Sequence, residues 1–148
     1  MIRSRRSVLT LDLKDDPELV AAYRRHHAAV WPEVLRSLRR VGVREMEIFA
    51  LGRRLVMLLT TAPGFDAERD FARHVASHPR CAEWEKVMEA FQQPPPGAPA
   101  GRLWTEMEPI FGLRSQLGGL ARRARRPGRE KPGRRPSREA RGRGRPRG

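Results

Sequence analysis

The chain of 148 residues is long enough for one domain and carries a formal net charge of +14. Residues 114–148 hold 14 Lys and Arg and two Glu, which leaves 17 Lys and Arg against 15 Asp and Glu in residues 1–113, a net of only +2. A nearly charge-balanced body argues against a nucleic-acid-binding domain and suits an enzyme that acts on small neutral substrates.

The first part of the chain predicts a strand followed by two helical segments. Residues 7–13 alternate between apolar and polar side chains, as in a half-buried strand. Asp16 and Pro17 mark a helix start, because Asp caps a first turn and Pro is tolerated at the first helical position. Pro32 then breaks or kinks the helix, and Gly42 ends the second segment. The side chains expected to face the core are Leu9, Leu11, Leu13, Leu19, Val20, Val30, Trp31, Val34, Leu35 and Leu38.

The middle of the chain predicts a hairpin and two more helical segments. Residues 43–51 and 55–60 form the two arms of an antiparallel hairpin that turns at Gly52. The continuous apolar sequence of the second arm suits a central strand. Residues 66–77 and 81–91 repeat their apolar positions at helical spacing and are separated by a proline. Met46, Ile48 and Ala50 share one face of the first arm, and the first of these helical segments is expected to turn Phe71, Ala72 and Val75 inward. The second segment carries Cys81, Trp84, Val87, Met88 and Phe91 at helical spacing.

A proline-rich loop over residues 94–99 leads to a fourth predicted strand over residues 103–111. The resulting order is the split β-α-β-β-α-β, or ferredoxin-like, arrangement, an α+β fold with helices on one face of an antiparallel sheet. Arg, Gly and Pro dominate from Arg114 onward, a composition that cannot bury a core. We therefore predict a folded domain over residues 1–113 and a disordered basic tail over residues 114–148.

Cysteine usage and hydropathy predict a cytoplasmic protein. A single cysteine, Cys81, excludes an internal disulfide and fits a reducing compartment. No apolar stretch approaches the roughly 18–20 residues that a membrane span requires. The basic start of the chain is followed by a charged strand rather than by the apolar core of a signal peptide.

The residue types most suggestive of chemistry lie in residues 23–33. Tyr23 and His27 are four residues apart, so a helix would place them on one face, one turn from each other. An imidazole with a pKa near neutrality is a suitable acid–base catalyst. The alternative is an amphipathic helix in which Tyr23 and His27 are packed core residues.

The pattern Tyr-x-x-x-His-x-x-x-Trp-Pro-Glu at residues 23–33 resembles the signature of the L-rhamnose mutarotase family. The resemblance continues through residues 46–49, 81–88 and 106–111 and covers residues 7–113. It implies an isomerase that interconverts the α and β anomers of a monosaccharide, L-rhamnose or a similar 6-deoxy sugar, through the open-chain aldehyde. It implies neither a metal nor a cofactor. It also implies a homodimer, in which two sheets form a dimeric α+β barrel.

The resemblance also assigns site residues. His27 is expected to donate a proton, Tyr23 to donate a hydrogen bond to a sugar hydroxyl, and Trp84 to offer its ring to the C–H face of the sugar. Met46 and Glu85 complete the expected substrate-binding set and depart from the family pattern, which has a tyrosine at the first position and often a second tryptophan at the other. The missing phenol implies reduced activity or a different preferred sugar. Glu85 is either a replacement carboxylate or an exposed helix residue. Trp31 is expected to shape the wall of the site.

Two further patterns suggest other functions. His74 and His78 are four residues apart, but no supporting Glu or Cys accompanies them, so no metal site is predicted. Residues 143–146, Arg-Gly-Arg-Pro, resemble the core of minor-groove AT-hook segments, and a basic tail of this kind also has non-specific, salt-sensitive affinity for nucleic acids. The alternatives to a mutarotase are therefore a catalytically impaired sugar-binding relative or a protein that associates with nucleic acid through its tail.

Overall fold

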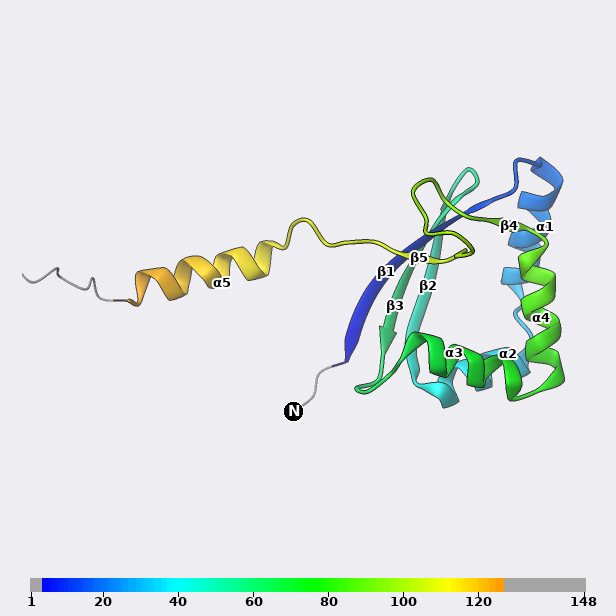
Figure 1. Cartoon of the computed structure of the whole chain (residues 1–148), viewed down its shortest axis with the longest axis horizontal. Helices are drawn as coiled ribbons and strands as arrows, with labels where there is room; N and C mark the ends of the chain where they lie inside the picture. Colours follow the sequence, from blue (N-terminus) through cyan, green and yellow to red (C-terminus); the bar gives the residue numbers. More distant parts are fainter. Residues whose placement is uncertain (1–3, 127–148) are drawn as a thin grey trace, which may run out of the picture. The chain divides into compact units, whose positions relative to one another are not determined.

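The computed structural model describes residues 4–126, and its chain divides into two compact units (Figure 1). The first unit ends at Glu108 and contains a five-stranded sheet and four helices. The second unit begins at Pro109, and its described part contains one helix. The division falls close to the boundary predicted after residue 113.

The sheet is antiparallel, with the order β2-β3-β1-β4. β2 (Val43–Leu51) and β3 (Arg54–Thr61) form the predicted hairpin, and β3 is the central strand because it also pairs along the length of β1 (Arg5–Leu13). Two short strands, β4 (Gln92–Gln93) and β5 (Thr105–Glu106), pair with the other edge of β1. The structure confirms the α+β fold and its antiparallel sheet.

The prediction of one long fourth strand over residues 103–111 is wrong. Only β5 pairs with β1, and the backbone N–H of Met107 then donates to the carbonyl of Val8 at 2.7 Å. Pro109 has no N–H and cannot extend such a ladder. The rest of this edge of β1 is occupied by β4, where Asp12 lies opposite Gln93.

Four helices cover one face of the sheet (Figure 1). They are α1 (Pro17–Ala28), α2 (Pro32–Val41), α3 (Ala67–Ala76) and α4 (Pro79–Glu89). The predicted cap of α1 is confirmed, because the Asp16 carboxylate accepts from the backbone N–H of Glu18 at 2.9 Å. The predicted stop of α2 is confirmed too, because Gly42 has a φ of 110°, which favours glycine.

α1 ends at Ala28, before Val30 and Trp31, because a residue that precedes proline is driven out of the helical region. Val30 and Trp31 are still partly buried and pack against the core. Two other predicted inward faces differ from the structure. On α2, Leu35 is 53% exposed, and the small Ser37 is buried instead at the contact with α3. On α3, Ala72 is exposed and the buried residues are Asp70 and His74. Both polar side chains are tolerated inside because both are hydrogen-bonded.

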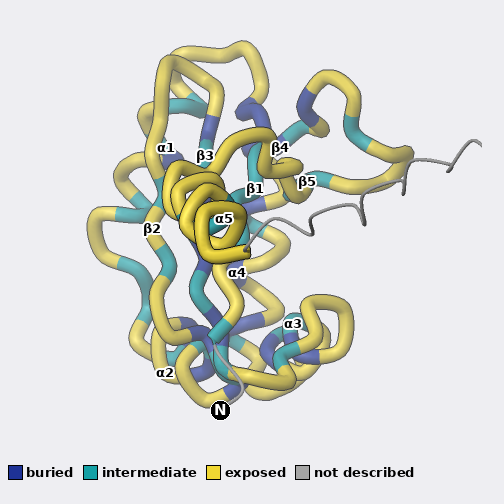
Figure 2. The backbone as a smooth tube through the Cα atoms, turned by 90° about the vertical axis from the view of Figure 1, so that its left-hand side faces the viewer, coloured by how far each residue is buried: buried dark blue, intermediate teal, exposed yellow. Residues whose placement is uncertain are grey.

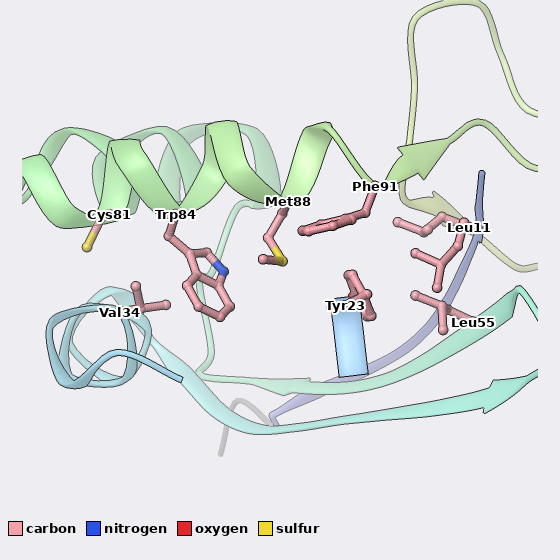
Figure 3. Close-up of a cluster of buried hydrophobic side chains, with 9 residues drawn as sticks. Leu11, Tyr23, Val34, Leu55, Cys81, Trp84, Met88 and Phe91 are labelled. Atoms are coloured by element: carbon pink, nitrogen blue, oxygen red, sulfur yellow. The ribbon is translucent and has the colours of Figure 1, made fainter. Parts of the chain in front are cut away.

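The main hydrophobic core lies between α1, α4 and the sheet (Figure 3). α4 directs Trp84 and Met88 toward the sheet, and Phe91, just past the helix, packs edge-on against Tyr23 with ring centroids 6.1 Å apart. Leu11 and Leu55 close the core from the sheet. This packing fixes the spacing between α1 and α4, from which four of the five predicted site residues extend.

The described part of the second unit contradicts the prediction of disorder from residue 114. α5 (Leu113–Ala124) is helical, with Leu113, Leu117 and Leu120 at the spacing of one helix face. Arg114, Gln116 and the Ala and Arg residues after Leu120 favour a helix. No residue of α5 is buried, as the exposed colouring along the helix shows (Figure 2). Residues 127–148, including the Arg-Gly-Arg-Pro motif, lie outside the described residues.

Within residues 4–126, no helix has both the length and the apolar character needed to cross a lipid bilayer.

Candidate functional site

A cavity of about 390 Å³ lies in the first unit, between the sheet and the four helices. Its volume falls near the lower end of the roughly 300–1,000 Å³ that ligand pockets span, which suits a small ligand. All five predicted site residues line it, namely Tyr23, His27, Met46, Trp84 and Glu85. The structure therefore gathers residues from α1, β2 and α4 that are up to about 60 positions apart in the sequence.

The walls of the cavity are mostly apolar. Met46, Ile48 and Met57 contribute from the sheet, and Phe71 and Val75 contribute from α3. The polar side chains that line the cavity are Tyr23, His27, His74, Glu85, Gln92, Arg102 and Glu106. An apolar cavity with a few convergent polar groups is the usual form of a small-molecule site.

His27 is enclosed by aromatic rings. The Tyr23 ring stacks on the imidazole with centroids 4.1 Å apart, and the Trp84 ring meets it edge-on at 5.5 Å. Trp31 does not line the cavity, but it supports Trp84 from behind, with centroids 5.2 Å apart. The Arg80 guanidinium lies 3.6 Å from the centroid of the Trp31 ring. The predicted role of Trp31 in shaping the wall fits this position.

A hydrogen bond to the backbone determines which nitrogen of the neutral His27 ring carries the hydrogen. Nδ1 lies 3.0 Å from the backbone carbonyl of Tyr23, one turn earlier. A carbonyl oxygen can only accept, so Nδ1 carries the hydrogen and Nε2 of the neutral ring is left with a free lone pair. Burial lowers the pKa of His27; the bond to Tyr23 opposes this effect, and the charge of His26 adds to it. The imidazole at neutral pH is therefore uncharged and able to accept a proton at Nε2.

Tyr23 and Glu85 differ in their exposure. Tyr23 is 3% exposed, and burial raises the pKa of its phenol to about 12 despite a smaller opposite effect of the Gln92 side chain, so the hydroxyl remains a hydrogen-bond donor. Glu85 lines the cavity yet counts among the exposed residues, which places it at the cavity mouth. Partial burial and the negative charge of Glu89 raise the pKa of the Glu85 carboxyl.

His74 is a cavity residue that the sequence analysis did not assign to the site. It is 5% exposed, and its Nδ1 lies 2.7 Å from the hydroxyl of Ser37 on α2. Burial lowers the pKa of His74. The available signal was its spacing, because Phe71, His74 and Val75 occupy positions i, i+3 and i+4 of one helix face.

The two histidines considered for a metal do not meet. His78 caps α4 by accepting the backbone N–H of Arg80 at 3.0 Å, whereas His74 faces the cavity. Residues 4–126 contain no group of three or more His, Cys, Asp or Glu placed to hold a metal ion.

A second hollow of about 460 Å³, more open than the first, adjoins the cavity. It shares Tyr23, His27 and Ile48 with the cavity and is otherwise bordered by residues that include Arg24 and Phe49. The His27 ring thus lies between two depressions and is accessible from both.

Comparison with known proteins identifies relatives for the first unit and the residues just after it. A family model described as L-rhamnose mutarotase matches residues 6–113. An L-fucose mutarotase of Xanthomonas campestris is 46% identical over 105 residues, which span 70% of this chain and 83% of the relative. A UPF0734 protein of Dictyostelium discoideum is 35% identical over 106 residues, covering 70% of this chain and 85% of the relative.

The fold also occurs in a solved structure. The crystal structure of an L-rhamnose mutarotase from Formosa agariphila superposes with a TM-score of 0.53 at 21% identity, over 74% of this chain and 99% of that protein. At this identity the likeness concerns the fold alone, and it agrees with the α+β architecture and antiparallel sheet described above.

Proposed function

The chain belongs to the L-rhamnose mutarotase family, and we propose that it interconverts the α and β anomers of L-rhamnose, L-fucose or a similar 6-deoxy sugar. The observation that carries this proposal is the state of His27, an uncharged imidazole whose Nε2 is free inside an apolar cavity. The relative named an L-fucose mutarotase supports a 6-deoxy sugar as the substrate class.

The proposed reaction needs one proton acceptor and one proton donor. A base removes the proton of the anomeric hydroxyl, the bond between C1 and the ring oxygen breaks, and an acid protonates that oxygen. Rotation about the C1–C2 bond and the reverse steps then form the other anomer. Every proton that is taken up is returned, so the protein ends in its starting state.

His27 and Glu85 are the proposed acid–base pair. The pKa of His27 is lowered from 6.5 and that of Glu85 is raised from 4.5, so the two values move toward each other. A smaller difference between the two pKa values lowers the free-energy cost of passing a single proton from one group to the other through the sugar. Once His27 has taken up the proton, it can return it to the sugar, and in that half of the reaction it acts as the predicted proton donor. Glu85 would supply the second group that the missing tyrosine at Met46 no longer provides.

The apolar walls favour a 6-deoxy sugar. The Trp84 ring offers a flat face to the C–H side of a pyranose, and the Tyr23 hydroxyl can donate to a ring hydroxyl. Met46 and Met57 line the floor contributed by the sheet and form an apolar surface for the C6 methyl group. A sugar with a C6 hydroxyl would leave that hydroxyl without a partner on this surface, which costs binding free energy.

We further propose that residues 1–113 form the catalytic domain and act as a homodimer. The helices cover one face of the sheet, and the other face presents half-buried Val8, Val56 and Leu58 together with Phe49, which is 53% exposed. Apolar side chains on an uncovered sheet face favour a second copy as a cover. Contact of the basic tail, residues 114–148, with nucleic acid remains a prediction.

The experiment that tests the proposed function is magnetisation exchange between the anomeric protons of L-rhamnose, L-fucose and D-glucose, measured by NMR with catalytic amounts of the protein. We expect faster exchange for one or both 6-deoxy sugars and a weaker effect on D-glucose. A folded protein that accelerates none of the three would overturn the proposal. Saturation-transfer difference spectra would then show whether the chain is a sugar-binding relative that has lost activity.

A further inference from the structure

The imidazole of His74 is the one polar side chain on the α3 wall of the cavity within the described residues. α3 and α1 lie at different ends of the helical layer (Figure 1), so His74 and His27 approach the cavity from different sides. The side chains beside His74 in the lining, Phe71 and Val75, are apolar. A buried histidine in such a wall needs either a structural or a functional reason.

A chain of hydroxyl groups fixes the tautomer of His74. The Ser77 hydroxyl donates to the backbone carbonyl of His74 at 2.7 Å, so its oxygen remains free to accept. The Ser37 hydroxyl lies 2.7 Å from the Ser77 oxygen and donates to it. Since the hydrogen of Ser37 is used there, its oxygen accepts from Nδ1 of His74, also at 2.7 Å. Nδ1 is therefore the protonated nitrogen, and Nε2 keeps a free lone pair.

Nε2 of His74 faces the cavity. Among residues 4–126, the His74 ring forms its hydrogen bond through Nδ1, and Nε2 forms none. Among residues 4–126, the side-chain polar atom that is both inaccessible to solvent and without a hydrogen-bond partner is Oε2 of Glu33. Nε2 of His74 has no partner either, so it must be accessible to solvent. For a side chain that is 5% exposed and lines the cavity, the remaining opening is the cavity itself.

We propose that His74 is a second sugar-binding residue, whose Nε2 accepts a hydrogen bond from a ring hydroxyl that takes no part in the reaction. The inference rests on the proposed function and adds a specificity-determining contact to it. The acceptor lies in the same apolar region as Met46, because Met46 and Phe71, one turn before His74 on α3, pack against the same buried cluster. His74 thus supplies a polar contact on the side of the cavity where the family tyrosine is absent.

A purely structural histidine would need Nδ1 alone. Asparagine places its amide nitrogen near the position of Nδ1 and can keep the bond to Ser37, but it has nothing at the position of Nε2. Glutamine reaches the position of Nε2 with an oxygen that accepts. The His74→Asn and His74→Gln variants therefore separate the structural bond from the proposed contact with sugar.

The test measures exchange rates of the full chain as a function of sugar concentration for the wild type, His74→Asn and His74→Gln. A matched control is His78→Asn, which removes an imidazole outside the cavity and retains a side-chain acceptor for the cap of α4. We expect His74→Asn to raise KM about tenfold with kcat within about twofold, because a bond to an unreactive hydroxyl stabilises ground and transition states alike. His74→Gln should recover most of the affinity, and His78→Asn should match the wild type.

The sugar itself provides a second readout. Among monodeoxy analogues of the preferred sugar, the one that lacks the bound hydroxyl should show the same KM with the wild type and with His74→Asn. An unchanged KM for His74→Asn, in an active and folded protein, would overturn the inference and leave the proposed function intact. A wild type that neither accelerates exchange nor binds any sugar would overturn both.

Discussion

The two imidazoles of the cavity reach the same chemical state in different ways. His74 is buried and His27 is half-buried, each has a lowered pKa, and each holds its hydrogen on Nδ1 and leaves Nε2 free. His27 is held by the carbonyl of its own helix, four residues earlier, and lies among aromatic rings. His74 is held by Ser37, which belongs to another helix and lies 37 residues away in the sequence.

Their neighbours explain the different roles that we assign to them. Glu85 lines the cavity with His27 and has a pKa shifted in the complementary direction, which suits an exchange of protons. The carboxylate nearest to His74 along α3, Asp70, is bound by Arg69 and Arg73, and this holds the pKa of Asp70 well below its usual range. Asp70 is therefore unsuited to relay a proton to or from His74, and a fixed hydrogen-bond acceptor is the role that we assign to His74.

The largest expected effect is that of His27→Gln. Glutamine can still form hydrogen bonds but cannot take up a proton, so we expect kcat to fall by roughly 10²–10⁴-fold, the usual contribution of a general acid–base group. NMR exchange of the anomeric protons measures this loss. The comparison between the two imidazoles requires a much smaller change in kcat for His74→Gln.

The matched control is His26→Gln at the adjacent position. Nδ1 of His26 makes the same kind of bond to its own helix, at 2.9 Å to the carbonyl of Ala22, but His26 does not line the cavity. We expect its kcat to remain within about threefold of the wild type. Equal losses in the two variants would show that packing of α1, and not proton transfer, limits the reaction.

The dependence of kcat on pH should report on His27 and not on His74. The reactive state holds one proton on the pair His27 and Glu85, so kcat should fall about tenfold per pH unit on both sides of a maximum. The maximum should lie on the acid side of neutrality, because the pKa of Glu85 is raised from 4.5 and that of His27 is lowered from 6.5. Glu85→Gln should remove one limb of the profile.

Titration of His74 should change a different parameter. Its pKa lies below 6.5, so Nε2 is free above that pH and becomes protonated as the pH falls through the lowered value. A protonated Nε2 cannot accept, so KM should rise on the acid side, and His74→Asn should abolish this rise. A KM independent of pH in the wild type would count against the assignment of His74.

A smaller effect is expected from Ser37→Ala. The substitution leaves the buried Nδ1–H of His74 without an acceptor, which costs about 1–3 kcal/mol of unfolding free energy. Ser77→Ala should cost less, because Ser77 is exposed and the Ser37 hydroxyl also lies within 3.4 Å of the carbonyl of His74. Denaturant unfolding measures both values, and the reverse order would contradict the hydroxyl chain as drawn.

The smallest effect is expected from removal of the residues after 113. The cavity is lined by residues between Leu9 and Glu106, so exchange of the anomeric protons should remain within about twofold of the full chain. Affinity for a polyanion such as heparin should fall sharply, because 14 of the 31 Lys and Arg are removed. A large loss of activity would place part of the catalytic machinery in the C-terminal unit.

Local patterns in the sequence determined much of this protein. Alternation predicted β1, the hairpin followed from apolar periodicity around Gly52, and the caps at Asp16 and Gly42 followed from their residue types. Tyr23 and His27 were also predictable together, since a four-residue spacing on a helix fixes their stacking without help from the rest of the chain. These features depend on interactions between residues that are neighbours in the sequence.

The tertiary structure decided those features that depend on contacts between residues far apart in the sequence. His74 and Ser37 are polar residues on helices whose periodicity gave no reason to bury them, and they are buried because the packing of α2 against α3 lets each satisfy the other. The placement of Glu85 at the cavity mouth and the short pairing of β5 have the same origin, since each depends on which surface the fold brings opposite. The free energy of a buried polar group depends on the partner it meets, and only the folded chain supplies that partner.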